Sequence, residues 1–432
     1  MTTIMPSQRP SQRAAGLTFT FAVLVLLAAE VLRVYWIMPM PGSQQGDTLG
    51  AAYALHRWIV AVRILAGGVA IWAAARLLAR GRWPARVLCV LSLALAGFVI
   101  YQTNGPMSAD VMFRQPTSLT FATAGKGAVA PDALVVGVAL ANPADPAGRT
   151  QARAYPIQFI GYHHQVRDMV AGQPVMVTYC TVCRTGRVFS PVVDGTADTF
   201  RLVGMDHWNA MFEDARTGSW WRQATGEAVA GPLKGKSLAE IPSQQMTWAA
   251  WSARHPGSDV LQPDPQFAPR YANMKGFAEG TNESTLTGRD SRSWQRKSWV
   301  VGVLAGNAAR AFDWNELVRE RVINDRVGGQ PVLLLLGADG VSFQAFDARP
   351  GGSGPQLDLE RTADPSRFRD RATGANWHES GLALDGPQAG TRLTAIPAYQ
   401  EFWHSWQDFR PATTARRNPA PPLPRRAGTR PE

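Results

Sequence analysis

Cysteine is scarce in this chain, with three among 432 residues. Only Cys180 and Cys183 are close in sequence, and they directly follow an apolar run at residues 174–178 that is expected as a β-strand, which puts the pair at the strand end. Cys89 lies in an apolar stretch where a small buried residue is expected. The chain also lacks a glycine-rich phosphate loop, a Ser-His-Asp arrangement and a His-Glu-x-x-His zinc motif. These absences argue against a nucleotide cofactor and leave the paired thiols as the main candidate for chemistry.

Long apolar runs are absent after Thr103, and three of them precede it, at about Ala15 to Met40, Trp58 to Ala79 and Val87 to Tyr101. A helix rises about 1.5 Å per residue, so each run covers roughly 30 Å of hydrocarbon, the third with little to spare. We therefore expect three transmembrane helices within residues 15–102 and a water-soluble remainder.

Arginines predict the orientation of these helices. Arg9 and Arg13 precede the first run, and the loop at residues 41–47 contains none. The short turn between the second and third runs holds four: Arg76, Arg80, Arg82 and Arg86. Basic residues favour the cytoplasmic side, so residues 1–14 are expected in the cytoplasm and everything after Tyr101 outside it. This predicts a protein of the bacterial inner membrane whose soluble region is periplasmic or otherwise extracytoplasmic.

The net charge of +11 is not accompanied by a nucleic-acid motif. Much of the excess lies in the turn between the membrane helices and in a tail at residues 414–432, which is rich in proline and arginine. Such a composition predicts disorder in the tail. The expected partner is therefore the lipid bilayer, and no nucleic acid is expected.

The soluble region repeats itself. Val135-Val136-Gly137-Val138 recurs as Val300-Val301-Gly302-Val303, and the later motifs recur in the same order, down to Trp248 with Trp251 and Trp403 with Trp406. We expect two homologous repeats at residues 131–258 and 297–413, joined by a linker or excursion at residues 259–296. Short β-type runs with Gly-Pro turns and a few helical stretches predict an α+β, β-rich fold for each repeat.

Comparing the repeats selects site candidates. The second repeat has Gly337 and Gly340 in place of Cys180 and Cys183. His163 and His164 are replaced as well, by Glu320 and Arg321. Residues that both repeats share are explained by the common fold, so the first repeat is expected to carry the site and the second to be without one.

A string of motifs in this region resembles the domain of unknown function 3179 family. It comprises Ala154-Tyr155-Pro156, His163, Asp168, Val177 to Cys183, Asp214, Thr217, Ser219, Trp221, Gln223, Gly231-Pro232-Leu233 and Gly235. The resemblance covers about Pro131 to Thr413. Where the family usually has Cys-Pro-Leu-Cys, this chain has Cys-Thr-Val-Cys at residues 180–183. The resemblance implies a fold and a site around the cysteines, and it brings no established activity.

Metal binding is one interpretation of the thiol pair. Cys-x-x-Cys followed by Gly186 resembles the knuckle of rubredoxins and zinc ribbons, which supplies two ligands. Further ligands are expected from His163, His164 or His207, with His163 preferred. Thiolate and imidazole ligands suit copper or zinc. On this hypothesis the protein supports an exported oxidoreductase.

Two other interpretations remain open, and with them whether the chain is an enzyme. Cys180 and Cys183 are also expected as a thiol-disulfide exchange pair or a structural disulfide, and Arg184 and Arg187 as cations that lower a thiol pKa. Alternatively, some of the fifteen tryptophans line a cleft for sugars or lipid headgroups in a non-catalytic or structural membrane module. Those expected there are Trp208, Trp220 and Trp221.

Overall fold

The computed structural model describes residues 9–145 and 147–416. The chain divides into two compact units. The anchor unit comprises Met1–Arg114, Arg201–Trp221 and Ala228–Gly235, and the sheet unit comprises Gln115–Phe200, Arg222–Glu227 and Lys236–Glu432. Of the predicted tail at residues 414–432, residues 417–432 lie outside the described part of the chain. Residues 1–8 of the predicted cytoplasmic segment lie outside it as well.

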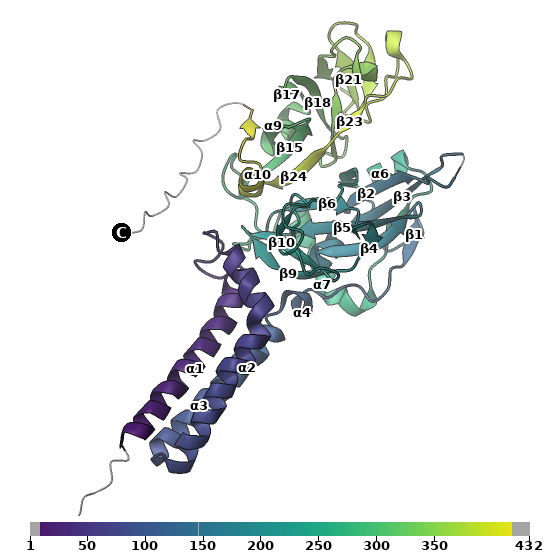
Figure 1. Cartoon of the computed structure of the whole chain (residues 1–432). Helices are drawn as coiled ribbons and strands as arrows, with labels where there is room; N and C mark the ends of the chain where they lie inside the picture. Colours follow the sequence, from purple (N-terminus) through teal and green to yellow (C-terminus); the bar gives the residue numbers. More distant parts are fainter. Residues whose placement is uncertain (1–8, 146, 417–432) are drawn as a thin grey trace, which may run out of the picture. The chain divides into compact units, whose positions relative to one another are not determined.

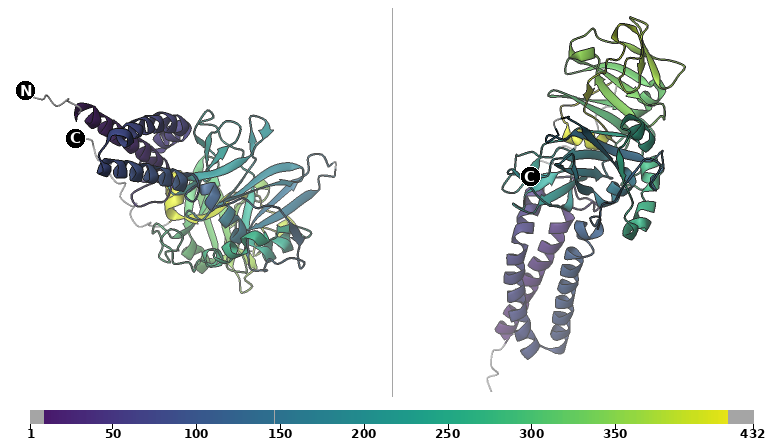
Figure 2. Two further views of the ribbon diagram at one scale, coloured as in Figure 1. Left: turned by 90° about the horizontal axis from the view of Figure 1, so that it is seen from below. Right: turned by 90° about the vertical axis from the view of Figure 1, so that its right-hand side faces the viewer.

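Three long helices form most of the anchor unit: α1 (Arg9–Tyr35), α2 (Leu49–Arg80) and α3 (Trp83–Asn104). They run side by side in both Figure 1 and Figure 2. All three are long and apolar enough to cross a membrane, which confirms the three helices expected from the apolar runs. The first ends before the predicted Met40, because Pro39 and Pro41 cannot continue a helix.

A polar cluster joins the three helices near one end of the bundle. The Glu30 carboxylate, fully buried, accepts hydrogen bonds from Arg63 Nε at 2.5 Å and from Arg33 at 3.2 Å. Thr103 on α3 donates to the same carboxylate at 2.9 Å. Buried charges are tolerated in apolar surroundings when they are paired and hydrogen-bonded, and this cluster meets both conditions.

A four-stranded sheet completes the anchor unit, in the order β12-β11-β10-β9. Its strands are β9 (Phe200–Asp206), β10 (Asn209–Asp214), β11 (Trp220–Arg222) and β12 (Ala228–Ala230). The sheet packs on the chain between α1 and α2 and on the first turns of α2, through a buried apolar cluster that includes Ile37, Ala52, Met211 and Trp220. A short helix, α4 (Ala109–Met112), follows the bundle.

The first half of the sheet unit has a five-stranded sheet ordered β1-β14-β3-β2-β13 and a three-stranded sheet ordered β4-β5-β6. The strands of the larger sheet are β1 (Phe121–Thr123), β2 (Leu134–Ala141), β3 (Thr150–Pro156), β13 (Ser243–Thr247) and β14 (Asp259–Leu261). Those of the smaller sheet are β4 (Gln165–Val170), β5 (Gln173–Cys180) and β6 (Thr185–Phe189). A hairpin of β7 (Val192–Val193) and β8 (Thr196–Ala197) follows β6.

The helices of this half are short: α5 (Ile157–His163), α6 (Trp248–Arg254), η1 (Pro265–Phe267), α7 (Ala268–Ala272) and α8 (Lys275–Glu279). Residues 259–296, expected as a linker or excursion, contribute β14, which pairs in parallel with β3. This region therefore includes a strand of the larger sheet.

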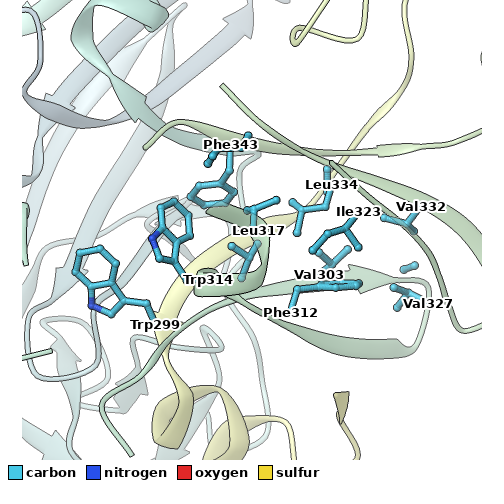
Figure 3. Close-up of a cluster of buried hydrophobic side chains, with 14 of the residues drawn as sticks. Trp299, Val303, Phe312, Trp314, Leu317, Ile323, Val327, Val332, Leu334 and Phe343 are labelled. Atoms are coloured by element: carbon cyan, nitrogen blue, oxygen red, sulfur yellow. The ribbon is translucent and has the colours of Figure 1, made fainter. Parts of the chain in front are cut away.

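The second half has sheets ordered β24-β15-β16-β25, β17-β18-β19-β23 and β20-β21-β22. The longer strands are β15 (Trp299–Ala305), β16 (Ala308–Asp313), β17 (Val322–Val327), β18 (Gln330–Leu336), β19 (Phe343–Asp347) and β24 (Ala398–Phe402). The shorter ones are β20 (Leu359–Arg361), β21 (Arg367–Asp370), β22 (Asn376–His378), β23 (Ala395–Ile396) and β25 (Thr414–Ala415). The helices are α9 (Trp314–Glu320), η2 (Pro350–Gly352), η3 (Gly386–Gln388) and α10 (Trp403–Phe409). Figure 3 shows the apolar core of this half, where side chains of α9 meet those of β15 to β19.

The two halves share local geometry. In the first, β2 pairs with β3 and β13, and in the second, β15 pairs with β16 and β24. A Cβ on Gly137 would collide with the Trp251 ring, and a Cβ on Gly302 would collide with the Trp406 ring. Each tryptophan thus packs directly on the backbone of the neighbouring strand. Together the observations establish three long apolar helices followed by a β-rich α+β region.

Candidate functional site

Cys180 and Cys183 lie in the hairpin between β5 and β6, within the sheet unit. Cys180 is the last residue of β5 and pairs with Thr185, the first residue of β6. Cys183 lies in the turn between them, and Arg184 closes that turn in the left-handed conformation, with φ of 55°. Both cysteines are thiols outside any disulfide, and both are fully buried. Their position at the strand end is the one expected from the sequence.

The two thiols are in direct contact. Cys183 hydrogen-bonds with Cys180 and with the Ser405 hydroxyl. Burial raises the pKa of the Cys183 thiol well above its ordinary value, and the neighbouring Cys180 raises it further. The Ser405 hydrogen bond and the charge of Lys297 act in the opposite direction without reversing the shift. The unliganded Cys183 thiol is therefore protonated at neutral pH.

Lys297 is the cation of this site. Its Nζ donates to the carbonyl oxygens of Val182 at 2.6 Å and Leu286 at 2.5 Å. Burial lowers the pKa of Lys297 to about 8, although the two thiols raise it. The ammonium group is thus held next to the Cys-x-x-Cys turn by backbone oxygens and remains mostly charged at neutral pH.

The second half supplies several of the groups around the thiols. The Phe402 amide donates to the Cys183 carbonyl at 2.9 Å. Ser405 lies 3.3 Å from the Thr185 hydroxyl and donates to Glu401 Oε2 at 3.0 Å. From the sequence we expected this half to carry no site of its own, and the structure shows that it contributes Lys297 and Ser405 to the surroundings of the thiols. Comparing the repeats position by position could not reveal them, because they act on the thiols of the other half.

The two arginines of the hairpin have other roles. Arg184 stacks on the Trp299 ring at 3.7 Å and donates to the carbonyls of Phe277 and Ala278 at 3.1 and 3.2 Å. Burial lowers the pKa of Arg184 to about 10. Arg187 pairs with Glu401. Lys297 is a cation that lowers the Cys183 pKa, which is the type of interaction that was expected from the sequence for the two arginines.

His163 and His164 are buried at the end of α5. The His163 Nε2 lies 2.6 Å from the Tyr271 hydroxyl, and its ring packs against Phe267. The His164 Nδ1 lies 3.1 Å from the Tyr162 carbonyl, and burial lowers the pKa of His164 to about 4. Both rings have close polar neighbours within their own half.

His207 belongs to the anchor unit, where its Nδ1 lies 2.6 Å from Asp206 Oδ1 in the turn between β9 and β10. Across the residues that the structure describes, no group of three or more His, Cys, Asp or Glu side chains is arranged to hold a metal ion. Of the predicted ligands, the structure therefore brings together Cys180 and Cys183.

The tryptophans expected in a binding cleft are largely buried. Trp220 is fully buried and donates to Glu213 at 2.8 Å, and Trp221 is 3% exposed and donates to Asp214 at 2.9 Å. Trp208 lies in the β9–β10 turn with φ of 69°. The first two thus stabilise the small sheet of the anchor unit.

The comparisons with known proteins support the motif analysis. Residues 117–413 match the family described as protein of unknown function (DUF3179). No curated protein and no solved structure matches the chain significantly. The family match contains both halves of the β-rich sheet unit, including the hairpin with its two thiols.

Proposed function

Because the chain belongs to the DUF3179 family, whose description assigns no activity, we propose a function from its own site: the Cys180–Cys183 pair binds one Cu(I) ion as a dithiolate. The observation that supports this proposal most directly is the contact between two fully buried thiols beside the ammonium group of Lys297.

Ligand number favours copper over zinc. A structural zinc ion takes four protein ligands, and a catalytic one takes three. The described residues offer no such group around the thiols. Soft thiolates select Cu(I), a soft monovalent ion that two opposed sulfurs suffice to bind. Of the two metals expected from the sequence, copper therefore fits the thiol pair better.

Charge balance favours the same ion. Two thiolates and one Cu(I) ion carry a net charge of −1, which is unfavourable in a buried site unless a cation compensates it. Lys297 interacts electrostatically with both cysteines and supplies that cation. The thiols lose their protons when the metal binds. The raised pKa of Cys183 opposes this loss, so metal binding must supply the free energy for it.

The proposed context is an extracytoplasmic copper site in a bacterial inner-membrane protein. The arginines around α1 and between α2 and α3 favour a cytoplasmic N-terminus, which would put the β-rich region outside. An exported redox enzyme that needs copper is the partner class this location favours. The shared strand pairings and the two Gly-Trp contacts support an origin of the region by duplication of one unit.

A reversible disulfide is the second candidate function. The hydrogen bond between Cys183 and Cys180 supports it, because thiols in contact need little movement to form a bond. Complete burial opposes exchange with another protein, since an attacking thiolate must reach the sulfur. Oxidation of the pair releases two electrons and two protons, so this function also requires an external oxidant.

The test is a competition titration of the reduced, full-length protein in detergent with a chromophoric Cu(I) chelator. We expect one tightly bound Cu(I) per chain, and its loss in Cys180→Ser and in Cys183→Ser. Cys89→Ser is the matched control, because this thiol is also buried but lies on α3. Cu(I) binding that survives both serine substitutions would disprove the proposal. A disulfide that forms in air and cycles with a dithiol reductant, without tight Cu(I) binding, would establish the second candidate instead.

A further inference from the structure

An open cavity of about 490 Å³ lies in the anchor unit, lined by Tyr53, Arg57 and Trp58 of α2 and by Gly231 and Pro232 after β12. Its volume is within the usual range of small-molecule sites. The thiol site uses none of these residues. We infer that this cavity binds the phosphate headgroup of an anionic phospholipid.

The position along α2 supports a lipid ligand. Helix α2 has 32 residues, which is longer than the roughly 20 needed to cross the hydrocarbon core. Its first turns pack against the small sheet through Ala52 and Tyr53. The apolar run of α2, in which Arg63 is the one charged residue before Arg76, begins just after Trp58. Trp58 is 67% exposed, as is common for tryptophans at the level of lipid headgroups. The cavity therefore lies at the expected boundary between membrane and water.

Arg57 gives the cavity its charge. Among the described residues it has no ion-pair partner. The acidic neighbours are already engaged: Glu213 accepts from Arg201 at 2.7 Å, and Asp214 accepts from Thr217 at 2.9 Å. A free guanidinium beside satisfied carboxylates favours an incoming anion, and its planar donors match a phosphate group.

The wall of the cavity is rigid. Tyr53 donates to the Gly218 carbonyl at 3.0 Å and packs edge-on against Trp220 at 5.0 Å. Gly231 has φ of 99°, and a Cβ there would lie 2.9 Å from the Tyr53 hydroxyl, so only glycine lets this loop approach the helix. The site is thus formed before a ligand arrives, which limits the entropy lost on binding.

Native mass spectrometry of the full-length protein in detergent tests this inference, with phosphatidylglycerol and phosphatidylcholine offered in equal amounts. Wild type should retain one phosphatidylglycerol under conditions that remove phosphatidylcholine. Arg57→Gln should bind phosphatidylglycerol at least about fivefold more weakly, as expected for one basic residue at an anionic surface. Arg57→Lys should recover part of the affinity.

The matched control is Arg80→Gln, which removes an exposed arginine at the opposite end of α2 and should leave the binding unchanged. Equal retention by wild type and Arg57→Gln would overturn the inference, and so would an equal loss in Arg80→Gln. Displacement of the lipid by inorganic phosphate would show that the cavity is a free-anion site. Unchanged thermal unfolding of Arg57→Gln verifies that the variant is folded.

Discussion

Lys297 shows how one side chain sets the properties of a buried site. Its ammonium group donates hydrogen bonds to two carbonyl oxygens and interacts electrostatically with both thiols. Its positive charge lowers the pKa of Cys183, against the effects of burial and of the neighbouring Cys180. A residue at the start of the second half thus sets the electrostatics of the thiol pair in the first half.

At the residue scale we predict that Lys297→Gln weakens Cu(I) binding by about tenfold or more, because the dithiolate site loses its compensating positive charge. The same chelator competition measures the change. Arg296→Gln is the control, since Arg296 is the exposed neighbour of Lys297. If both variants bound Cu(I) as wild type does, charge compensation by Lys297 would be ruled out.

At the scale of elements, the carboxylate of Glu213 on β10 links three parts of the anchor unit. It lies 3.1 Å from His56 on α2, and it accepts from Arg201 on β9 at 2.7 Å and from Trp220 on β11 at 2.8 Å. Burial acts to raise the pKa of Glu213, but these hydrogen bonds and the Arg201 charge outweigh it and lower the pKa from 4.5 to about 2.

The lowered pKa predicts acid sensitivity of the packing between α2 and the small sheet. The folded-state pKa is below the unfolded value, so the stabilisation is fully present above pH 4.5 and is lost as the pH falls towards 2. Its size is about 3 kcal/mol. Thermal unfolding in detergent across this range should show a smaller pH dependence for Glu213→Gln. Glu227→Gln, which removes an exposed ion pair, should behave as wild type; equal curves for all three would refute the prediction.

At the scale of the whole molecule, the Arg187–Glu401 pair links the two halves of the sheet unit. Both side chains are 1% exposed. Arg187 also stacks on the Tyr399 ring at 3.4 Å and lies 3.5 Å from Glu240. Burial acts to lower the pKa of Arg187, but Glu401, Tyr399 and Glu240 together more than offset this effect and raise the pKa above its ordinary value.

Breaking this pair should destabilise the sheet unit. Arg187→Met leaves a buried carboxylate unpaired, and we expect a loss of about 3 kcal/mol, with a similar loss for Glu401→Leu. The double variant should lose less than the sum, because no buried charge remains. Denaturant unfolding followed by tryptophan fluorescence measures all three. Strictly additive losses would show that the pair does not couple the halves.

Much of this organisation could be predicted from local patterns. The three apolar runs predict the helices because hydropathy over about 20 residues is a local property of the chain. The motif string from Tyr155 to Gly235 identified the family that the comparison confirms. The position of Cys180 at the end of a strand followed from the apolar run before it.

The tertiary structure decided which residues surround the thiols and which contact the helices. Lys297, just before β15, and Ser405, on α10, interact with Cys183 although they are far from it in sequence, and no local pattern encodes such contacts. Similarly, most of the motif from Asp214 to Gly235 lies in the anchor unit, because Trp220 and Met211 bury their side chains against Ile37 and Ala52, whereas its Gln223 belongs to the sheet unit. The sequence by itself determined the membrane helices, the β-rich composition and the thiol pair. Only the folded chain assigned the cation and the hydroxyl to that pair, because burial and charge depend on neighbours far away in sequence.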